Sequence, residues 1–333
     1  MLALTMGEPA GIGGEVALGA WHALRATGPA FVLIDDPERV AALADGGAAV
    51  VTVAGVEEAA GVFGEALPVL PLGQRVRARP GATDPANAAA VLASIRTAVR
   101  LAATGEAAGI VTNPIHKATL TAAGFAHPGH TEYLAELAGV PRTVMLLAAP
   151  ELRVVPVTIH VALADVPRLL TRALIEETAR IVASDMRTLF AVHRPRMAVA
   201  GLNPHAGEAG TMGREEVEVI APALARLAAE GLDVAGPFSA DTMFHPEARR
   251  AYDVALCMYH DQALIPLKTL AFDEGVNVTL GLPFVRTSPD HGTALGLAGR
   301  GLARPDSLIA AIRMADRLAA NRRAAALAPA LSA

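Results

Sequence analysis

The stretch YDVALCMYHDQALIPLK, residues 252–268, places a polar cluster directly after an apolar run. The apolar part is short and continuous, which is typical of a strand buried inside an α/β sheet. Core strands usually stop in glycine, asparagine or serine, but this one ends in His-Asp-Gln at 260–262, with Lys268 a few residues later. Such an ending indicates a binding or catalytic site rather than a simple turn.

The beginning of the chain shows the same alternation of strand and helix. The apolar run 2–6 is followed by the glycine-rich turn GEPAGIGGE at 7–15. Helical spacing over 16–27 and a second apolar run at 31–35 come next. Strand, turn, helix and strand in this order begin a parallel layer, so the sequence predicts an α/β fold.

Further elements follow from the same patterns along the rest of the chain. The stretch 143–149 and the stretch 153–160 are apolar neighbours that predict a hairpin. The run 277–288 predicts an edge strand interrupted by Pro283. The other expected helices cover 89–105, 130–139, 174–190, 215–231 and 306–328, the other expected strands lie within 107–114, 196–201 and 252–258, and 73–86 is expected to be a loop.

Composition narrows the class of protein. The 333 residues carry a net charge of −5 and only 4% aromatic residues, which argues against nucleic acid as a partner. Cys257 is the only cysteine, so a disulfide within the chain is excluded and a reducing cytoplasm is expected. The start lacks a basic signal segment, and no apolar run is long enough to span a bilayer. We therefore expect a cytoplasmic protein that binds neither nucleic acid nor membranes.

Three histidines stand at or just past the ends of separate strand-like runs: His160, His205 and His260. Ligands of open α/β sheets bind beyond the carboxyl ends of the strands, and three imidazoles with an open position form a catalytic zinc arrangement. Asp241 and Asp261 could be further ligands or partners of the imidazole N–H groups. The alternative is that each histidine is an ordinary hydrogen-bonded loop residue, since no short metal-binding spacing links the three.

The segment HPGHTEYLAELAG places His127 and His130 before a helix that starts near Thr131. The N-terminus of a helix favours phosphate binding. The alternative, equally well supported, is that Thr131 only caps the helix. The glycine-rich turn at 7–15 lacks the order of a dinucleotide fingerprint and of a phosphate-binding loop. A tight turn without a ligand explains it equally well.

Near the C-terminus, HGTALGLAGRG at 291–301 combines a histidine with small residues that let a planar ligand approach the backbone. Lys268, Arg286 and Asn277 add positive charge and a polar fork close to the expected site. Arginine suits bidentate binding of carboxylate or phosphate, but surface charge is the usual role of any one such residue. Cys257 is expected in the core rather than as a nucleophile.

Taken together, these motifs identify a family that the whole sequence resembles. The segments are GEPAGIGGEV, TNPIHK, HPGHTEYLAELAG, GLNPHAGEAGTMGREE, GPFSADTMF, MYHDQALIPLK and GVNVTLGLPFVRTSPDHGTALGLAGRG. In this order they resemble the 4-hydroxythreonine-4-phosphate dehydrogenases of pyridoxal phosphate biosynthesis, nearly from end to end. The last segment is also similar to the nucleotide loop of isopropylmalate and isocitrate dehydrogenases.

The resemblance implies a fold of two α/β/α domains with a cleft between them, as in isopropylmalate dehydrogenase. The first domain would comprise residues 1–125 and 270–333 and carry the nucleotide loop. The second would comprise 126–269 and carry the metal ligands and the dimer contacts. Both boundaries are approximate.

The resemblance also implies a site shared between the two subunits of a homodimer. A divalent metal, zinc with magnesium or cobalt as alternatives, would be held by His160, His205 and His260. The remaining implied roles are substrate contacts at His130, Thr131, Lys268, Asn277 and Arg286, proton transfer at Lys268 and Asp241, and contacts to NAD, with NADP as the alternative, at His291, Gly292, Thr293 and Ala294.

The implied reaction is NAD-dependent oxidation of 4-phosphohydroxy-L-threonine at C3, followed by metal-assisted decarboxylation to 3-amino-2-oxopropyl phosphate. Three departures blur the choice of substrate within the family: Glu8 replaces a common aspartate, GGEV replaces Gly-Pro-Glu, and Thr211 stands where a histidine is frequent. A related dehydrogenase of 4-phosphothreonate or 4-phosphoerythronate is therefore the first alternative. A metal-dependent phosphohydrolase and a binding protein without catalysis are the alternatives of a different class.

Overall fold

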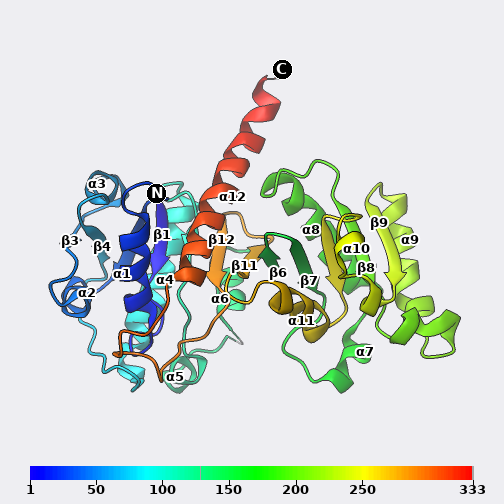
Figure 1. Ribbon diagram of the computed structural model, residues 1–333, viewed down its shortest axis with the longest axis horizontal. Coiled ribbons are helices and arrows are strands. Elements are labelled where there is room, and N and C mark those ends of the chain that lie inside the picture. The colour runs from blue at the N-terminus through cyan, green and yellow to red at the C-terminus, as the bar shows by residue number, and fades with distance from the viewer. Residues whose placement is uncertain (128, 332–333) are drawn as a thin grey trace. The chain divides into compact units, whose positions relative to one another are not determined.

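The computed structural model describes residues 1–127 and 129–331, and the chain divides into two compact units. Unit 1 comprises Met1–Arg142 and Leu282–Ala320, and unit 2 comprises Thr143–Gly281 with the chain from Asn321 onward. The boundaries expected from the sequence stand at 125/126 and 269/270. Each unit is described separately below, with its strands and helices labelled as in Figure 1.

Unit 1 is built on a parallel sheet of short buried strands. Its strands follow the order β3-β4-β2-β1-β5-β12, and each neighbouring pair is parallel. The bounds are β1 Leu2–Thr5, β2 Phe31–Asp35, β3 Val50–Thr52, β4 Leu67–Pro71, β5 Ile110–Val111 and β12 Arg286–Pro289. Parallel strands covered on both faces read as continuous apolar runs, which is why LALT and FVLID were recognisable in the sequence.

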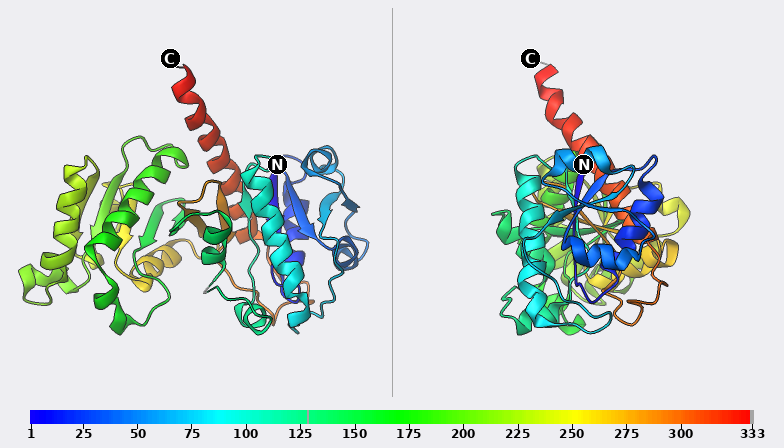
Figure 2. Two further views of the ribbon diagram at one scale, coloured as in Figure 1. Left: turned by 180° about the vertical axis from the view of Figure 1, so that it is seen from behind. Right: turned by 90° about the vertical axis from the view of Figure 1, so that its left-hand side faces the viewer.

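Helices cover both faces of the unit 1 sheet. Helix α1 lies on one face and α4 on the other, as comparison of Figures 1 and 2 shows. The helices of this unit are α1 Gly13–Leu24, α2 Pro37–Ala44, α3 Val56–Val62, α4 Ala88–Ala103, α5 Lys117–Ala122, α6 His130–Leu137 and the start of α12, Asp306–Leu331, with a 3-10 turn at Pro85–Asn87.

Unit 2 has a mixed sheet in the order β11-β6-β7-β10-β8-β9. The pairs β11–β6 and β6–β7 are antiparallel, and the pairs from β7 to β9 are parallel. The bounds are β6 Val144–Ala149, β7 Leu152–Pro156, β8 Arg196–Ala200, β9 Asp233–Phe238, β10 Val254–Cys257 and β11 Val276–Leu280.

In unit 2, helix α11 packs on one face of the sheet, while α8 and α9 cover the other (Figures 1 and 2). The helices are α7 Val166–Leu169, α8 Arg172–Thr188, α9 Ala221–Ala229, α10 Pro246–Arg249 and α11 His260–Leu270. Short 3-10 turns span Leu163–Asp165, Pro204–Gly210 and Ala240–Thr242, and a π-helical turn spans Glu216–Ile220.

The apolar cores lie between these sheets and their helices. In unit 2, Cys257 is fully buried with Val154 from β7 and Leu264 and Leu267 from α11. The burial of Cys257 confirms the prediction of a core residue, and it raises the pKa of the thiol. Within the described residues, no helix is both long and apolar enough to cross a membrane.

Most predicted elements are present, and the predicted α/β class and the hairpin of β6 and β7 are confirmed. The single edge strand expected over 277–288 is wrong. That run forms β11, antiparallel to β6 in unit 2, and β12, parallel to β5 in unit 1. The turn at 281–285 separates two strands with different partners, which an apolar pattern cannot reveal.

The polar cluster at 260–262 is the start of a helix rather than a bare strand tip. Helix α11 begins at His260 and continues through Pro266 to Leu270. An interior proline normally argues against a helix, and this one is tolerated in the second half of an eleven-residue helix that buries Ala263, Leu264 and Leu267.

Candidate active site

The three predicted metal ligands follow three adjacent parallel strands of unit 2. Strands β7, β10 and β8 are neighbours in that order, and His160, His260 and His205 come after them respectively. Asp241 follows β9, which pairs with β8. Because carboxyl ends of parallel strands share one edge of a sheet, all four side chains belong to the same edge.

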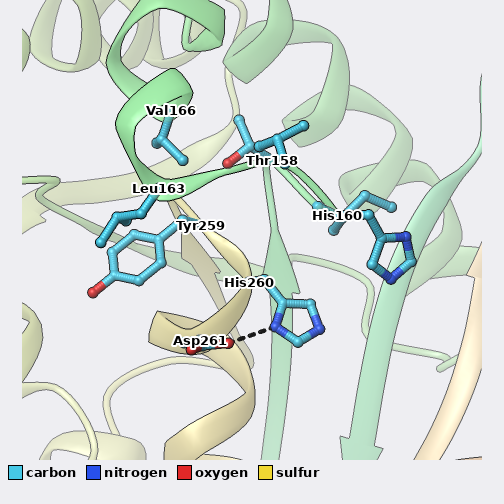
Figure 3. Close-up of a pocket in the computed structure, with 9 residues that line it drawn as sticks. Thr158, His160, Leu163, Val166, Tyr259, His260 and Asp261 are labelled. Carbon is cyan, nitrogen blue, oxygen red and sulfur yellow. Dashed lines mark hydrogen bonds and ion pairs between the residues drawn. The ribbon is translucent and has the colours of Figure 1, made fainter.

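His160 and His260 lie together. Both line a hollow of about 270 Å³, and their ring centroids are 5.8 Å apart. Figure 3 shows the two rings as neighbours, with Asp261 on the other side of the His260 ring. The Nδ1 atom of His260 is 2.7 Å from Oδ1 of Asp261. When Nδ1 carries the proton, it donates to this carboxylate and leaves the Nε2 lone pair available for a ligand.

His205 lies in a second hollow on the same edge. This hollow has a volume of about 400 Å³ and is also lined by Asp241 and Gln262. The Ser239 hydroxyl donates to Oδ1 of Asp241 over 2.5 Å. Tyr259 lines both hollows, so it lies between the hollow of His205 and the hollow of the His160–His260 pair.

Across residues 1–127 and 129–331, no three histidine, cysteine or acidic side chains are grouped closely enough to hold a metal ion. A single chain instead offers two partial donor sets, His160 with His260 and His205 with Asp241. Imidazole and carboxylate donors of this kind suit a divalent cation. The residues therefore fit a metal in their chemistry, and each set alone leaves the coordination incomplete.

The segment that carries His205 has an unusual backbone. Residues 205–209 all have positive φ, between 41° and 73°, and only Gly207 among them is a glycine. A left-handed conformation costs roughly 1–2 kcal/mol for each residue with a Cβ atom. Such a turn persists only where its surroundings hold it firmly.

Glu216 provides that support. The residue is 3% exposed, and its Oε1 accepts the N–H groups of Leu202 and Asn203, each over 2.7 Å. Its Oε2 accepts the Asn203 side-chain amide over 3.0 Å. A Cβ atom at Gly207 would stand 2.5 Å from Oε2, so only glycine fits beside this carboxylate. The buried acid thus anchors the turn on which His205 stands.

We expect Glu216→Ala to lower the free energy of unfolding by about 3 kcal/mol, because the N–H groups of the half-buried residues Leu202 and Asn203 both lose their acceptor. Urea unfolding would measure the loss. Glu218→Ala is the matched control, since Glu218 is exposed and pairs only at the surface with Arg214, and its removal should cost less than about 1 kcal/mol. Equal losses in the two variants would refute the anchoring role.

Unit 1 contains a buried cationic site. Arg286 on β12 is 4% exposed, and its Nη2 and Nε donate to the Thr112 hydroxyl over 2.7 and 3.1 Å. Burial lowers the pKa of the Arg286 guanidinium to about 10. A desolvated cation of this kind favours an anionic ligand, which would restore the lost solvation.

His130 belongs to the same region. The residue is half-buried, and its Nε2 atom is covered and has no hydrogen-bond partner within the described part of the chain. Burial, and next the charge of Arg286, hold the pKa of His130 well below its usual value. An anion at this place would accept a hydrogen bond from Nε2. It would also counteract the burial and the Arg286 charge, which both favour the neutral imidazole.

The start of helix α6 excludes the interpretation in which Thr131 caps the helix. The helix begins at His130 after Gly129, and no side chain caps it. Thr131 therefore lies inside the first turn and does not act as the cap. The His127 ring contacts the rings of Phe125 and Tyr133, and its Nδ1 lies 3.4 Å from Oε2 of Glu136. These contacts indicate a structural role for His127.

The low pKa of His130 makes stability depend on pH. The unfolded chain takes up a proton near pH 6.5 while the folded chain does not, so unfolding becomes easier as the pH falls below that value. We expect this loss to be at most about 1.4 kcal/mol per pH unit and to be absent in His130→Gln. Urea unfolding at pH 7.5 and 5.5 measures it, and equal pH dependence in both proteins would contradict the assignment.

The predicted nucleotide loop packs against the glycine-rich turn of unit 1. The Ile12 N–H donates to the Thr293 carbonyl over 3.1 Å, and a Cβ atom at Gly11 would stand 2.6 Å from that oxygen. The His291 Nδ1 contacts the Gly292 carbonyl over 2.8 Å, while its covered Nε2 has no partner within the described residues. Glycine at position 11 therefore allows the loop at 291–294 to pack closely against the glycine-rich turn.

The other predicted contacts lie in unit 2. Lys268 is in the last turn of α11, with its ammonium 5.8 Å from the centre of the Phe272 ring. Asn277 is in β11, and its covered Oδ1 has no hydrogen-bond partner within the described residues. A polar atom of this kind is suited to a ligand.

Sequence reasoning missed two residues of this region, Glu216 and the bridging role of Gln262. A signal existed for the first. Glu216, Ile220, Ala223, Leu224 and Leu227 are all buried at helical spacing, so an acid begins an apolar stripe. A charged residue at such a position is almost always paired. The sequence places Gln262 in the polar cluster, but its hydrogen-bond partners lie far apart in the chain and a local pattern does not reveal them.

Comparison with known proteins places the chain among relatives of one kind. Residues 29–315 match the family described as "Pyridoxal phosphate biosynthetic protein PdxA". A protein of Methylorubrum populi named 4-hydroxythreonine-4-phosphate dehydrogenase is 60% identical over 96% of this chain and 94% of its own length. A protein of the same name from Bradyrhizobium diazoefficiens is 54% identical over 96% of this chain and 97% of its own.

Solved structures of dehydrogenases are also similar to this chain. The crystal structure of 4-hydroxythreonine-4-phosphate dehydrogenase from Klebsiella pneumoniae has a TM-score of 0.86 at 36% identity, covering 96% of this chain and 99% of that one. A terephthalate 1,2-cis-dihydrodiol dehydrogenase from Burkholderia xenovorans has a TM-score of 0.66 at 28% identity, with 95% and 97% covered.

Proposed function

Because the chain belongs to the PdxA family, we propose that it oxidises 4-phosphohydroxy-L-threonine at C3 with NAD and promotes loss of carbon dioxide, giving 3-amino-2-oxopropyl phosphate. The observation that carries this proposal is the 60% identity, over 96% of the chain, to a relative named for that substrate. The strand-end imidazoles of unit 2 and the buried cation of unit 1 support it.

His160, His205 and His260 would hold the divalent ion, zinc first, with magnesium or cobalt as alternatives. When bound, the ion supplies a Lewis acid that stabilises negative charge on a substrate oxygen. Asp261 would keep Nδ1 of His260 protonated and so direct Nε2 to the ligand side.

We infer a homodimer in which the second copy completes the donor set that one chain leaves partial. Large apolar side chains of unit 2 are exposed near the proposed ligands, including Leu163 at 66% beside the His160–His260 hollow and Ile265 at 63% on α11. Surface of this kind commonly marks a protein–protein interface.

For the substrate, Arg286 and His130 would bind an anionic group, with Thr131 at the start of α6. The cationic region is already desolvated before the ligand arrives, so it would position the substrate at little further cost. Lys268 and Asn277 of unit 2 are the other proposed contacts.

Proton transfer would rest on Lys268 and Asp241. Oxidation at C3 removes a proton from the hydroxyl and a hydride from the carbon, and the hydride goes to the nicotinamide when NAD is bound. Loss of carbon dioxide then leaves a carbanion equivalent that takes up one proton. His291, Gly292, Thr293 and Ala294 would contact NAD, with NADP as the alternative. We place the enzyme in the reducing cytoplasm on account of its single, buried Cys257.

The test is a spectrophotometric assay of NAD reduction with 4-phosphohydroxythreonine, 4-phosphothreonate and 4-phosphoerythronate, with and without a chelator. Metal-dependent reduction of NAD fastest with the first substrate supports the proposal. A preference for either of the others would select a related dehydrogenase. Released phosphate without NADH would show a phosphohydrolase.

A further inference from the structure

We propose that Gln262 is a positioning residue that sets the spacing of the segments carrying His160, His205 and His260, and thereby the affinity for the divalent ion. This inference rests on the proposed function for the metal, and it assigns a role to a residue that contacts neither metal nor substrate in that proposal. It derives from a set of hydrogen bonds that joins the ends of four neighbouring strands of unit 2, in the order β7, β10, β8 and β9.

The first part of the set joins the segments of His260 and His160. The Met258 N–H donates to Oε1 of Gln262 over 2.6 Å. The Met258 carbonyl accepts both the N–H of Thr158, over 3.2 Å, and its hydroxyl, over 2.7 Å. Thr158 stands two residues before His160 and Met258 two residues before His260, so these bonds fix one imidazole relative to the other.

The second part joins the same segment to His205. Nε2 of Gln262 donates to the Gly201 carbonyl over 2.8 Å, at the end of β8. The Gly201 N–H donates in turn to Phe238 at the end of β9, over 2.7 Å. Gly201 also lies close to the His205 segment, because a Cβ atom added there would stand 2.9 Å from the Cα of Ala206.

Only a primary amide of this length performs both tasks. It accepts one N–H and donates to one carbonyl at the same time, whereas a carboxylate only accepts and an apolar side chain does neither. Gln262 is half-buried, so the loss of either bond is incompletely replaced by water. Partners that orient metal ligands typically change metal affinity by 10–100-fold when removed.

The experiment measures zinc binding to the chelator-stripped, full-length protein by calorimetry, without substrate or NAD. We expect Gln262→Met, which keeps the length and loses both bonds, to raise the zinc Kd about 10–100-fold. Gln74→Met, at the chain's other glutamine and exposed in unit 1, is the matched control and should leave Kd unchanged. Excess zinc should restore most of the kcat of Gln262→Met, while its KM for NAD stays the same.

A merely structural role would lower the thermal midpoint and the fraction of active protein without moving the zinc Kd, and that result would overturn the proposal. If Gln262→Met fails to fold, Gln262→Asn, whose shorter amide cannot reach both partners, replaces it with the same expectation. Wild-type protein that binds no zinc, magnesium or cobalt would instead refute the metal site of the proposed function. A normal wild-type Kd that Gln262→Met leaves unchanged would refute only the role of Gln262.

Discussion

We expect His205→Ala to lower turnover at least about 10³-fold while the fold stays intact. A metal acting as a Lewis acid contributes several kcal/mol of charge stabilisation, and each 1.4 kcal/mol corresponds to about a tenfold change in rate. The imidazole is exposed and lines a hollow, so its removal leaves no cavity in the core. Steady-state kinetics with added zinc would measure the loss of turnover, and circular dichroism would show whether the fold is intact.

The control for this variant is His193→Ala, because His193 is exposed on unit 2 and follows α8 rather than a site strand. It should retain wild-type turnover. If the chelated wild type keeps most of its activity, or if His205→Ala does, the metal role proposed for this histidine is wrong.

Arg286→Ala should raise the KM for the phosphorylated substrate roughly 100-fold and leave the KM for NAD nearly unchanged. Truncating one partner of a buried charged contact costs about 2–5 kcal/mol, most of it because the other charge loses its counterpart. Arg286→Met, which fills the same volume without charge, should behave alike and so separates the loss of charge from the loss of packing.

Arg100→Ala is the matched control, since this side chain of unit 1 is 56% exposed and pairs at the surface with Glu106. Its substrate KM should not move. Equal losses of substrate and NAD affinity in Arg286→Ala would show that the arginine organises the unit as a whole and does not bind the substrate anion.

The sequence predicted the layer and the strand ends because both depend on local apolar patterning. The runs at 153–157 and 254–257 end where polar residues begin, and the structure has strands there. Strand β9 was not predicted, because its residues are largely exposed and Gly236 and Pro237 interrupt the pattern. The division of 277–288 between two units depends on partners far away in the chain.

The candidate site shows the same limit. The positions of His160, His205 and His260 after their strands could be read directly, because each follows an apolar run. The left-handed turn at 205–209 could not, since alanine and glutamate rarely adopt that conformation and Glu216 supplies the support from a later helix. The positions of residues after strands could be predicted because they follow local order, whereas features that depend on hydrogen bonds between distant segments could not.

The order β7-β10-β8 has a consequence for synthesis on the ribosome. Strand β10 pairs Ala255 with Val154 on one side and Ala198 on the other, so the middle strand emerges last. Until about residue 257 has left the exit tunnel, the nascent chain presents two unpaired strand edges, which are prone to wrong pairing. Chains terminated before Val254 should therefore aggregate, and the sheet edge that carries the proposed metal ligands should form only late in translation.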